Sequence, residues 1–219
     1  MNKILLYFFA LFSFLPLISC QQTAYRTKDN DNKSYINDFE LLQENSSNNT
    51  SIVIKSPKAI IDPTKNYIEI INSSINILNN DKKDVSIIAG TSLLNNANNS
   101  ISVYNNAYIS LLDSNNTYIQ TNSFDWDLNS SILQLPTPLD INYNNTNIIS
   151  SNGIYNINSR LLNLDNIIFN RSIIGPSGYT LYKINIISDH AKWSKDKKIL
   201  EFHSNNKQVK STIDFLSVK

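Results

Sequence analysis

Few side chains in this 219-residue sequence could perform acid–base or nucleophilic chemistry. His190 and His203 are the only histidines, and neither lies near a motif for a nucleophile that a general base would activate. Asp125, Asp127 and Asp140 occupy strand or turn positions with no evident carboxylate pairing. The single cysteine excludes an internal disulfide and any Cys/His metal-binding spacing. We therefore expect neither an enzyme nor a metal or cofactor site.

The one cysteine points instead to a chemical modification. The sequence begins with Lys3 in a short polar segment, continues with an apolar run over residues 4–15, and reaches Leu-Ile-Ser-Cys at residues 17–20. The run is short for a bilayer span but typical of a signal peptide, and the four residues resemble the bacterial lipobox. We expect residues 1–19 to be removed and Cys20 to carry several acyl chains that anchor it in a membrane. The alternative is an uncleaved signal anchor in which Cys20 ends a helix.

Composition favours a β-rich domain behind this leader. The chain has 35 asparagines and 32 isoleucines, and 41% of its residues are hydrophobic, which is enough for a core. Isoleucine and aromatic residues favour strands, and asparagine favours the turns between them. Residues 20–38 are polar, charged and without period, which predicts a flexible linker. The folded domain is expected over residues 39–219.

Charge argues against nucleic acid as a partner. The formal net charge of +1 falls to zero when Lys3 leaves with the leader, because 18 basic and 18 acidic side chains remain. No basic stripe is visible along the chain. The lysine cluster at residues 192–198 is expected to be a solvated turn.

One unit is repeated five times along the predicted domain. Each copy has an isoleucine, a small residue two positions later, and a large apolar anchor five positions after that. Two further apolar residues follow seven and nine positions beyond the anchor. The three leading columns are Ile54, Ile87, Ile119, Ile148 and Ile186; Ser56, Ala89, Thr121, Ser150 and Ser188; and Ile61, Leu94, Trp126, Tyr155 and Trp193.

The spacing inside each unit predicts two strands joined by a turn. Apolar residues at i and i+2 have strand period, whereas the odd step after the small residue requires a bulge or corner. Turn-forming stretches such as "NINSR" and "DLNSS" follow the anchors. Pro136 and Pro138 predict a bend at a sheet edge, and His190 is expected at a solvent-facing turn position. The predicted fold class is all-β: an open antiparallel β-jelly roll built from about five repeated two-strand units.

The apolar columns supply the candidate binding surface. They line either an open lipid-binding groove or a closed packed core between two sheets, and the sequence leaves both readings open. The groove candidates are Ile54, Ile61, Ile87, Leu94, Ile119, Trp126, Leu133, Ile148, Tyr155, Leu162, Ile186 and Trp193. Unpaired strands at the ends of an open jelly roll can pair with another copy of the fold. The partner-edge candidates are Phe39 and Leu41 at the front and Val209, Ile213 and Phe215 at the back.

Two stretches carry a family resemblance: "FELLQENSSNNTSIVIKSPKAIIDPTKNYIEI" near the start and "FDWDLNSSILQLPTPLDINYNNTNIISSNGIYNINSRLLNLDNIIF" in the middle. Both run from an apolar strand through small residues, a large anchor next to Asp or Asn, and a turn to an apolar pair two residues apart, which is Ile-x-Ile in the first stretch and Leu-x-Leu in the second. Over about Phe39 to Phe202 the pattern resembles the LptC family of periplasmic lipopolysaccharide-export proteins. More loosely, it is similar to LptA and OstA-type domains.

The resemblance implies a function. Such a protein would accept lipopolysaccharide or a related glycolipid from an inner-membrane ABC transporter at its N-terminal edge. It would pass the lipid to an LptA-like bridge protein of the same fold by edge-strand pairing at its C-terminal edge. Many family members have an uncleaved N-terminal helix, whereas here lipidated Cys20 would hold the chain at the periplasmic face of a Gram-negative-type envelope, at the inner membrane. Gln21 differs from the aspartate that retains some lipoproteins there. The rival hypothesis is a surface-exposed β-rich lipoprotein that binds protein or carbohydrate.

Overall fold

The computed structural model describes residues 33–219 except 46–48, 113–116, 177, 206–207 and 216–219. The predicted leader, Cys20 and most of the predicted linker lie outside these residues. The first strand begins at Ser34, five residues before the predicted domain start at Phe39. None of the described residues belongs to a helix long and apolar enough to cross a membrane.

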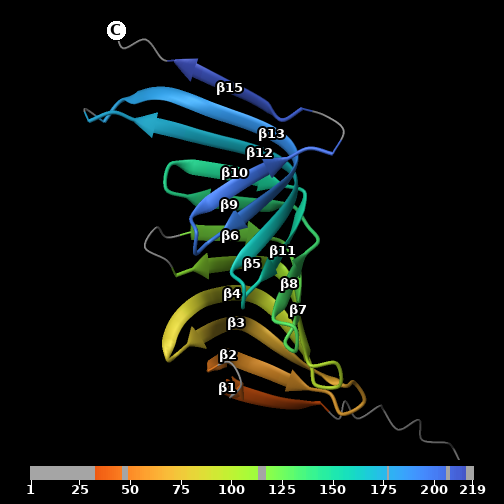
Figure 1. The fold of residues 1–219 in the computed structure, drawn as a ribbon. Helices are drawn as coiled ribbons and strands as arrows, with labels where there is room; N and C mark the ends of the chain where they lie inside the picture. Colours follow the sequence, from red (N-terminus) through yellow and green to blue (C-terminus); the bar gives the residue numbers. More distant parts are fainter. Residues whose placement is uncertain (1–32, 46–48, 113–116, 177, 206–207, 216–219) are drawn as a thin grey trace, which may run out of the picture. The chain divides into compact units, whose positions relative to one another are not determined.

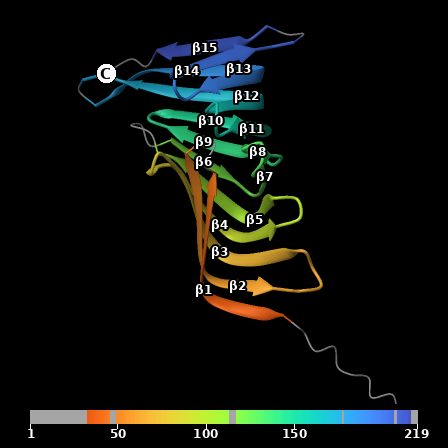
Figure 2. The same cartoon turned by 60° about the horizontal axis from the view of Figure 1, so that its bottom comes forward.

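In the described part of the chain, fifteen antiparallel strands form one sheet. The strands are β1 (Ser34–Asn45), β2 (Thr50–Ile61), β3 (Tyr67–Asn79), β4 (Lys82–Asn95), β5 (Ser100–Leu111), β6 (Thr117–Thr121), β7 (Phe124–Asp127), β8 (Ile132–Leu135), β9 (Leu139–Tyr143), β10 (Thr146–Ser150), β11 (Asn152–Asn156), β12 (Leu161–Ile174), β13 (Thr180–Ser194), β14 (Ile199–His203) and β15 (Lys210–Phe215). Among the described residues, β1 pairs only with β2, and β14 and β15 pair only with β13 (Figures 1 and 2). The sheet is therefore open at its ends, which confirms the predicted open β-jelly roll.

The sheet divides into two arms because its long strands change neighbours halfway along. β5 pairs with β7 through residues 100–103 and with β6 through residues 107–111. β12 divides in the same way between β11 and β10, and β13 divides between β14 and β15. We name these the β7 arm (β7, β8, β11, β14) and the β6 arm (β6, β9, β10, β15), each with the adjoining halves of the long strands (Figures 1 and 2).

A corner separates the two arms in every unit. Ladder pairing is interrupted in β2 at residues 56–57, in β4 at Gly90 and in β13 at Asp189. The chain leaves strand conformation between β6 and β7 and between β10 and β11. Other long strands bend at asparagines with positive φ, a conformation that Asn tolerates better than most residues: Asn72, Asn105, Asn106 and Asn166. The corner that the odd step of the repeat predicted is thus present in all five units.

The small-residue column of the repeat supplies hydroxyl groups to these corners. The Ser150 hydroxyl donates to the carbonyl oxygens of Asn152 and Asp165, each 2.7 Å from Oγ. The same Oγ accepts a hydrogen bond from the Asp165 N–H. Ser56 and Ser188 donate to the carbonyl two residues ahead in the same way. Hydroxyl pairs lie at the remaining corners, Ser73–Ser92 and Thr121–Thr137. At the Ser56, Ser150 and Ser188 corners, side-chain hydroxyls therefore bond to backbone carbonyls next to the break in the ladder.

In the second unit the small column holds Ala89, and Gly90 makes the corner. A Cβ at Gly90 would lie 2.5 Å from the carbonyl oxygen of Asn105, so the backbone would have to shift. Gly90→Ala is therefore expected to lower the free energy of unfolding by about 1–3 kcal/mol, measured by urea denaturation. Thr91→Ala, one residue along the same strand, is the control, with an expected loss below about 1 kcal/mol. Equal losses for the two variants would contradict this account of the corner.

Each of the five turns that follow the anchors is organised by a side-chain oxygen of the residue directly after the anchor. Each oxygen accepts a hydrogen bond from a backbone N–H inside its turn: Asp62 from Thr64, Asn95 from Ala97, Asp127 from Asn129, Asn156 from Ser159, and Ser194 from Lys197. The Ser130 hydroxyl also donates to Asp127 and holds the pKa of that carboxyl below its usual range. The turns predicted from "DLNSS" and "NINSR" are confirmed, and each unit is a bent hairpin.

The prediction for Pro136 and Pro138 is half correct. The bend is confirmed, because the two prolines flank Thr137 where the chain passes from β8 in the β7 arm to β9 in the β6 arm. The edge position is wrong, since β8 pairs with β7 and β11, and β9 pairs with β6 and β10. Proline is tolerated in the middle of this sheet because residues 136–138 lie between the strands, where no ladder N–H is needed.

Candidate functional site: the apolar interior between the arms

A row of isoleucines crosses the β6 arm, one residue per strand. Each member of the row is the cross-strand partner of the next member, so the side chains lie side by side on one face of the sheet. The members of this isoleucine row are Leu41, Ile54, Ile75, Ile87, Ile109, Ile119, Ile141, Ile148, Phe169 and Ile186. The leading isoleucines of the five repeat units are therefore every second member of this row.

A second row crosses the β7 arm and contains the anchors of the repeat. The members of this anchor row are Ile61, Ile68, Leu94, Ile101, Trp126, Leu133, Tyr155, Leu162, Trp193 and Leu200. All twelve residues that the sequence nominated as groove candidates lie in one of these two rows. The sequence did not establish that they form two uninterrupted strips perpendicular to the strands.

All members of the two rows except Ile61 belong to one hydrophobic cluster or pack against it. The Tyr143 and Trp193 rings lie 6.0 Å apart, and the Phe169 and Phe202 rings lie 5.3 Å apart, so side chains of the two arms touch. Of the groove candidates, only Ile61 and Ile186 are more than 9% exposed. In this structure the interior is a packed core, closed over its middle, rather than an open groove.

The interior is less closed at both ends of the sheet. Partly buried hydrophobic residues pack against the core at each end. At the β1 end these are Ile36, Leu41, Ile52 and Ile68, and at the β14–β15 end they are Ile184, Ile186, Leu200 and Phe202. The apolar surface is therefore continuous from β1 to β13 and β14, and it is partly accessible at both ends.

Trp126 places a polar group in the middle of this interior. The side chain is 2% exposed, and its indole N–H has no hydrogen-bond acceptor among the described residues. A buried donor left without a partner costs about 1–3 kcal/mol. The interior thus contains a polar group for which the described residues provide no acceptor.

A charged cluster joins the outer ends of the two arms. Asp84, near the start of β4 in the β6 arm, accepts from Lys195 Nζ at 2.9 Å and from Arg160 Nη2 at 3.1 Å. Lys195 and Arg160 belong to turns of the β7 arm, after β13 and β11. We call these three residues the clasp. Asp196 and Asp84, whose carboxylates contact the Arg160 guanidinium, raise its pKa.

The clasp corrects the prediction of a solvated lysine turn at residues 192–198. Lys192, Lys197 and Lys198 are exposed as expected, but the Lys195 side chain is only 7% exposed. Its ammonium group can be buried because the carboxylate of Asp84 compensates its charge. Sequence patterns could not find this pair, since its members are 111 residues apart.

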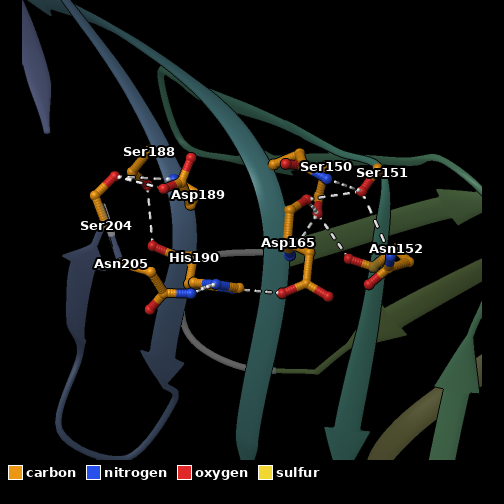
Figure 3. A network of polar contacts seen from close by, with 10 residues as sticks. Ser150, Ser151, Asn152, Asp165, Ser188, Asp189, His190, Ser204 and Asn205 are labelled. Carbon is orange, nitrogen blue, oxygen red and sulfur yellow. Dashed lines mark hydrogen bonds and ion pairs between the residues drawn. The ribbon is translucent and has the colours of Figure 1, made fainter. Parts of the chain in front are cut away.

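The two histidines and neighbouring hydroxyls do not form a catalytic triad. His190 Nδ1 lies 2.7 Å from Asp165 Oδ1, and its Nε2 lies 2.8 Å from Asn205 Nδ2 (Figure 3). The Ser188 hydroxyl donates to the backbone carbonyl of His190 and not to its ring. His190 therefore lies in strand β13, beside the corner, rather than in the turn expected from the sequence; its side chain is 43% exposed, as a solvent-facing position requires, and it ties β13 to β12.

The aspartates that the sequence singled out also have structural roles. Asp125 accepts from Ser102, and Asp140 accepts from the amides of Asn142 and Asn147. Asp127 organises the turn after β7, as described above. Among the described residues, no group of three His, Cys, Asp or Glu side chains could hold a metal ion.

The partner-edge candidates lie at the two ends of the sheet but differ in exposure. On β1, Phe39 is buried and Leu41 packs against the core, so both side chains face the interior. On β15, Ile213 is 50% and Phe215 is 79% exposed. Val209 lies just before β15, whose range begins at Lys210. The C-terminal edge therefore offers exposed apolar side chains as well as unpaired backbone groups.

Together, the fold and the interior define an all-β jelly-roll protein whose two arms enclose two rows of apolar side chains. The sequence profile of the family described as "Lipopolysaccharide-assembly, LptC-related" matches residues 3–168, more than half of the chain. The chain belongs to this family, as the resemblance of the two quoted stretches predicted, and is a periplasmic component of lipopolysaccharide transport.

Two further comparisons complete this result. No curated protein matches the chain significantly. A solved structure similar to it is that of LptH from Pseudomonas aeruginosa, the LptA-homologous periplasmic component of the conserved lipopolysaccharide transport device. The match covers 57% of this chain and 95% of that chain, with a TM-score of 0.44 and 11% sequence identity.

Proposed function

We propose that this protein is a lipid-anchored carrier that takes lipopolysaccharide or a related glycolipid from an inner-membrane ABC transporter. It passes the glycolipid along the space between its arms to an LptA-like bridge protein of the same fold. The observation that carries this proposal is the pair of apolar rows: the isoleucine row runs without interruption from β1 to β13, and the anchor row from β2 to β14. The half-buried residues at both ends provide an entrance and an exit.

Carrying an acyl chain requires the arms to separate, because packed side chains fill the middle of the interior. Transfer of a chain from water gains about 0.8 kcal/mol per CH₂, so one chain of about twelve carbons gains roughly 10 kcal/mol. Opening the clasp returns both charged groups to water, so it costs less than the loss of about 3–5 kcal/mol that follows when one partner of a buried ion pair is removed. The lipid can therefore offset the opening of the clasp, and its chains then replace the contacts between the arms.

The membrane anchor is the acylated Cys20, and residues 21–32 lead from it to the β1 end. This arrangement holds the N-terminal end of the interior near the inner membrane, where the transporter releases its lipid. Acyl chains in the bilayer provide stable anchoring without a spanning helix. The Trp126 N–H gives the interior one donor for an ester or hydroxyl oxygen of the carried lipid.

Handover to the bridge protein uses the β15 edge. Removing residues 209–219 deletes β15 and leaves β13 as the edge strand. Because β13 differs from β15 in sequence and in position, binding to the bridge protein should be lost in a pull-down. β15 pairs only with β13, so the β-sheet circular dichroism of the remainder should persist. The matched control removes residues 216–219 alone and should bind as the full chain does. Retained binding after the longer deletion would refute handover at this edge.

A further inference from the structure

A hollow of about 760 Å³ opens beside the clasp, between turns of the two arms. Residues of the β3–β4 turn and the start of β4 line one side, and residues of the turns after β11 and β13 line the other. Five of its lining residues are basic: Lys82, Lys83, Arg160, Lys195 and Lys198. Only Asp84 and Asp196 are acidic, so the lining carries a formal charge of +3.

Three of these cations are not compensated by the surrounding protein. Lys82, Lys83 and Lys198 are exposed, and none forms an ion pair with a carboxylate of the described residues. They face the same hollow from opposite arms. Charges of one sign that converge on a hollow attract a counter-ion, and ammonium and guanidinium groups are the usual protein ligands of phosphate.

We propose that this hollow is a binding site for phosphate groups, with Lys82, Lys83 and Lys198 as the first ligands and Arg160 completing the site. Resting on the carrier function proposed above, the ligand is the phosphorylated headgroup of the carried glycolipid. The headgroup would stay outside the apolar interior, at its rim, while the acyl chains lie between the arms.

The same anion would weaken the clasp. Arg160 contacts Asp84 through Nη2 and Asp196 through Nη1, and a phosphate in the hollow competes with both carboxylates for this guanidinium. The Asp84 carboxylate would also be repelled by the incoming negative charge. Headgroup binding is therefore coupled to separation of the arms, which links recognition of the lipid to opening of its path.

The test compares a Lys82→Gln/Lys83→Gln/Lys198→Gln variant of the full-length protein with wild type in detergent solution. All three lysines are exposed, so the variant should fold normally. The control carries Lys183→Gln, Lys192→Gln and Lys210→Gln, which removes the same charge from exposed positions outside the hollow. The probes are a bis-phosphorylated glycolipid in micelles, the same glycolipid after enzymatic removal of its phosphates, and inorganic pyrophosphate.

We expect the hollow variant to bind the phosphorylated glycolipid about tenfold more weakly or worse, since it loses charge-assisted contacts. It should bind the dephosphorylated glycolipid as wild type does, and the control should bind all probes as wild type does. Selective loss of pyrophosphate binding, with lipid binding unchanged, would keep the site but assign it to a free anion. Unchanged binding of both phosphorylated probes, or an equal loss in the control, would overturn the site.

These outcomes separate this inference from the proposed function. A wild-type protein that binds the two glycolipids equally well overturns the assignment of the site to the lipid headgroup and leaves the carrier intact. A wild-type protein that binds pyrophosphate through the three lysines but neither glycolipid overturns the carrier and leaves an anion site.

Discussion

Replacing Asp84 with alanine is expected to lower the free energy of unfolding by about 3–5 kcal/mol, measured by urea denaturation. Both carboxylate oxygens of Asp84 are used, one by Lys195 and one by Arg160. The substitution leaves the Lys195 ammonium buried without its counter-charge, which is the costly consequence of breaking a buried pair. The Asp84 carbonyl still accepts from the Leu112 N–H, so the local strand pairing is preserved.

Two controls separate the clasp from ordinary surface charge. Asp196→Ala removes the exposed partner of Arg160 and should cost less than about 1 kcal/mol. The double variant Asp84→Leu/Lys195→Leu replaces the pair with apolar side chains and should be much closer to wild type than Asp84→Ala. A loss for Asp84→Ala no larger than that for Asp196→Ala would show that the clasp does not hold the arms together.

Leu133→Ala is the second substitution with a large expected effect, a loss of about 2–5 kcal/mol. Leu133 is fully buried in the anchor row, where Trp126 and Tyr155 are its cross-strand partners. The cost combines the lost transfer free energy with the cavity left between the arms. Urea denaturation of the lipid-free protein measures it directly.

The neighbouring residue gives the matched control for this substitution. Gln134 is on the same strand but points to the opposite, exposed face, so Gln134→Ala should change the stability by less than about 0.5 kcal/mol. Added lipopolysaccharide should raise the denaturation midpoint of both variants, because a ligand that binds only the folded state stabilises it. Similar losses for Leu133→Ala and Gln134→Ala would mean that the anchor row is not the packed interior.

The repeat made much of the fold predictable from sequence. Alternating apolar residues fix which face of each strand is buried, so the columns of Ile119, Trp126 and Tyr155 could be assigned to the interior. The odd step in each unit required a corner, and the structure has one there. The hydroxyl column at Ser56, Ser150 and Ser188 was seen as small residues, and its hydrogen-bonding role became visible only when the opposing carbonyls were located.

Features that depend on long-range pairing could not be predicted. Asp84 and Lys195 meet only because a twisted sheet brings the ends of its two arms together, and neither residue stands in a motif. The strand order is equally non-local, since β5 pairs with both β6 and β7, and β12 with both β10 and β11. Pro136 was assigned to an edge because proline is rare inside sheets, whereas here it lies in a break between two central strands.

The central claim is that lipopolysaccharide travels between the two arms. It is tested most directly by placing a photoreactive amino acid at Trp126 or Tyr155, inside the interior, and at their outward-facing neighbours Asp125 or Ile154. On irradiation of cells, the two inner positions should form adducts with lipopolysaccharide, and the two outer positions should not. Absence of adducts from both inner positions, or equal adducts from the outer ones, would contradict the account.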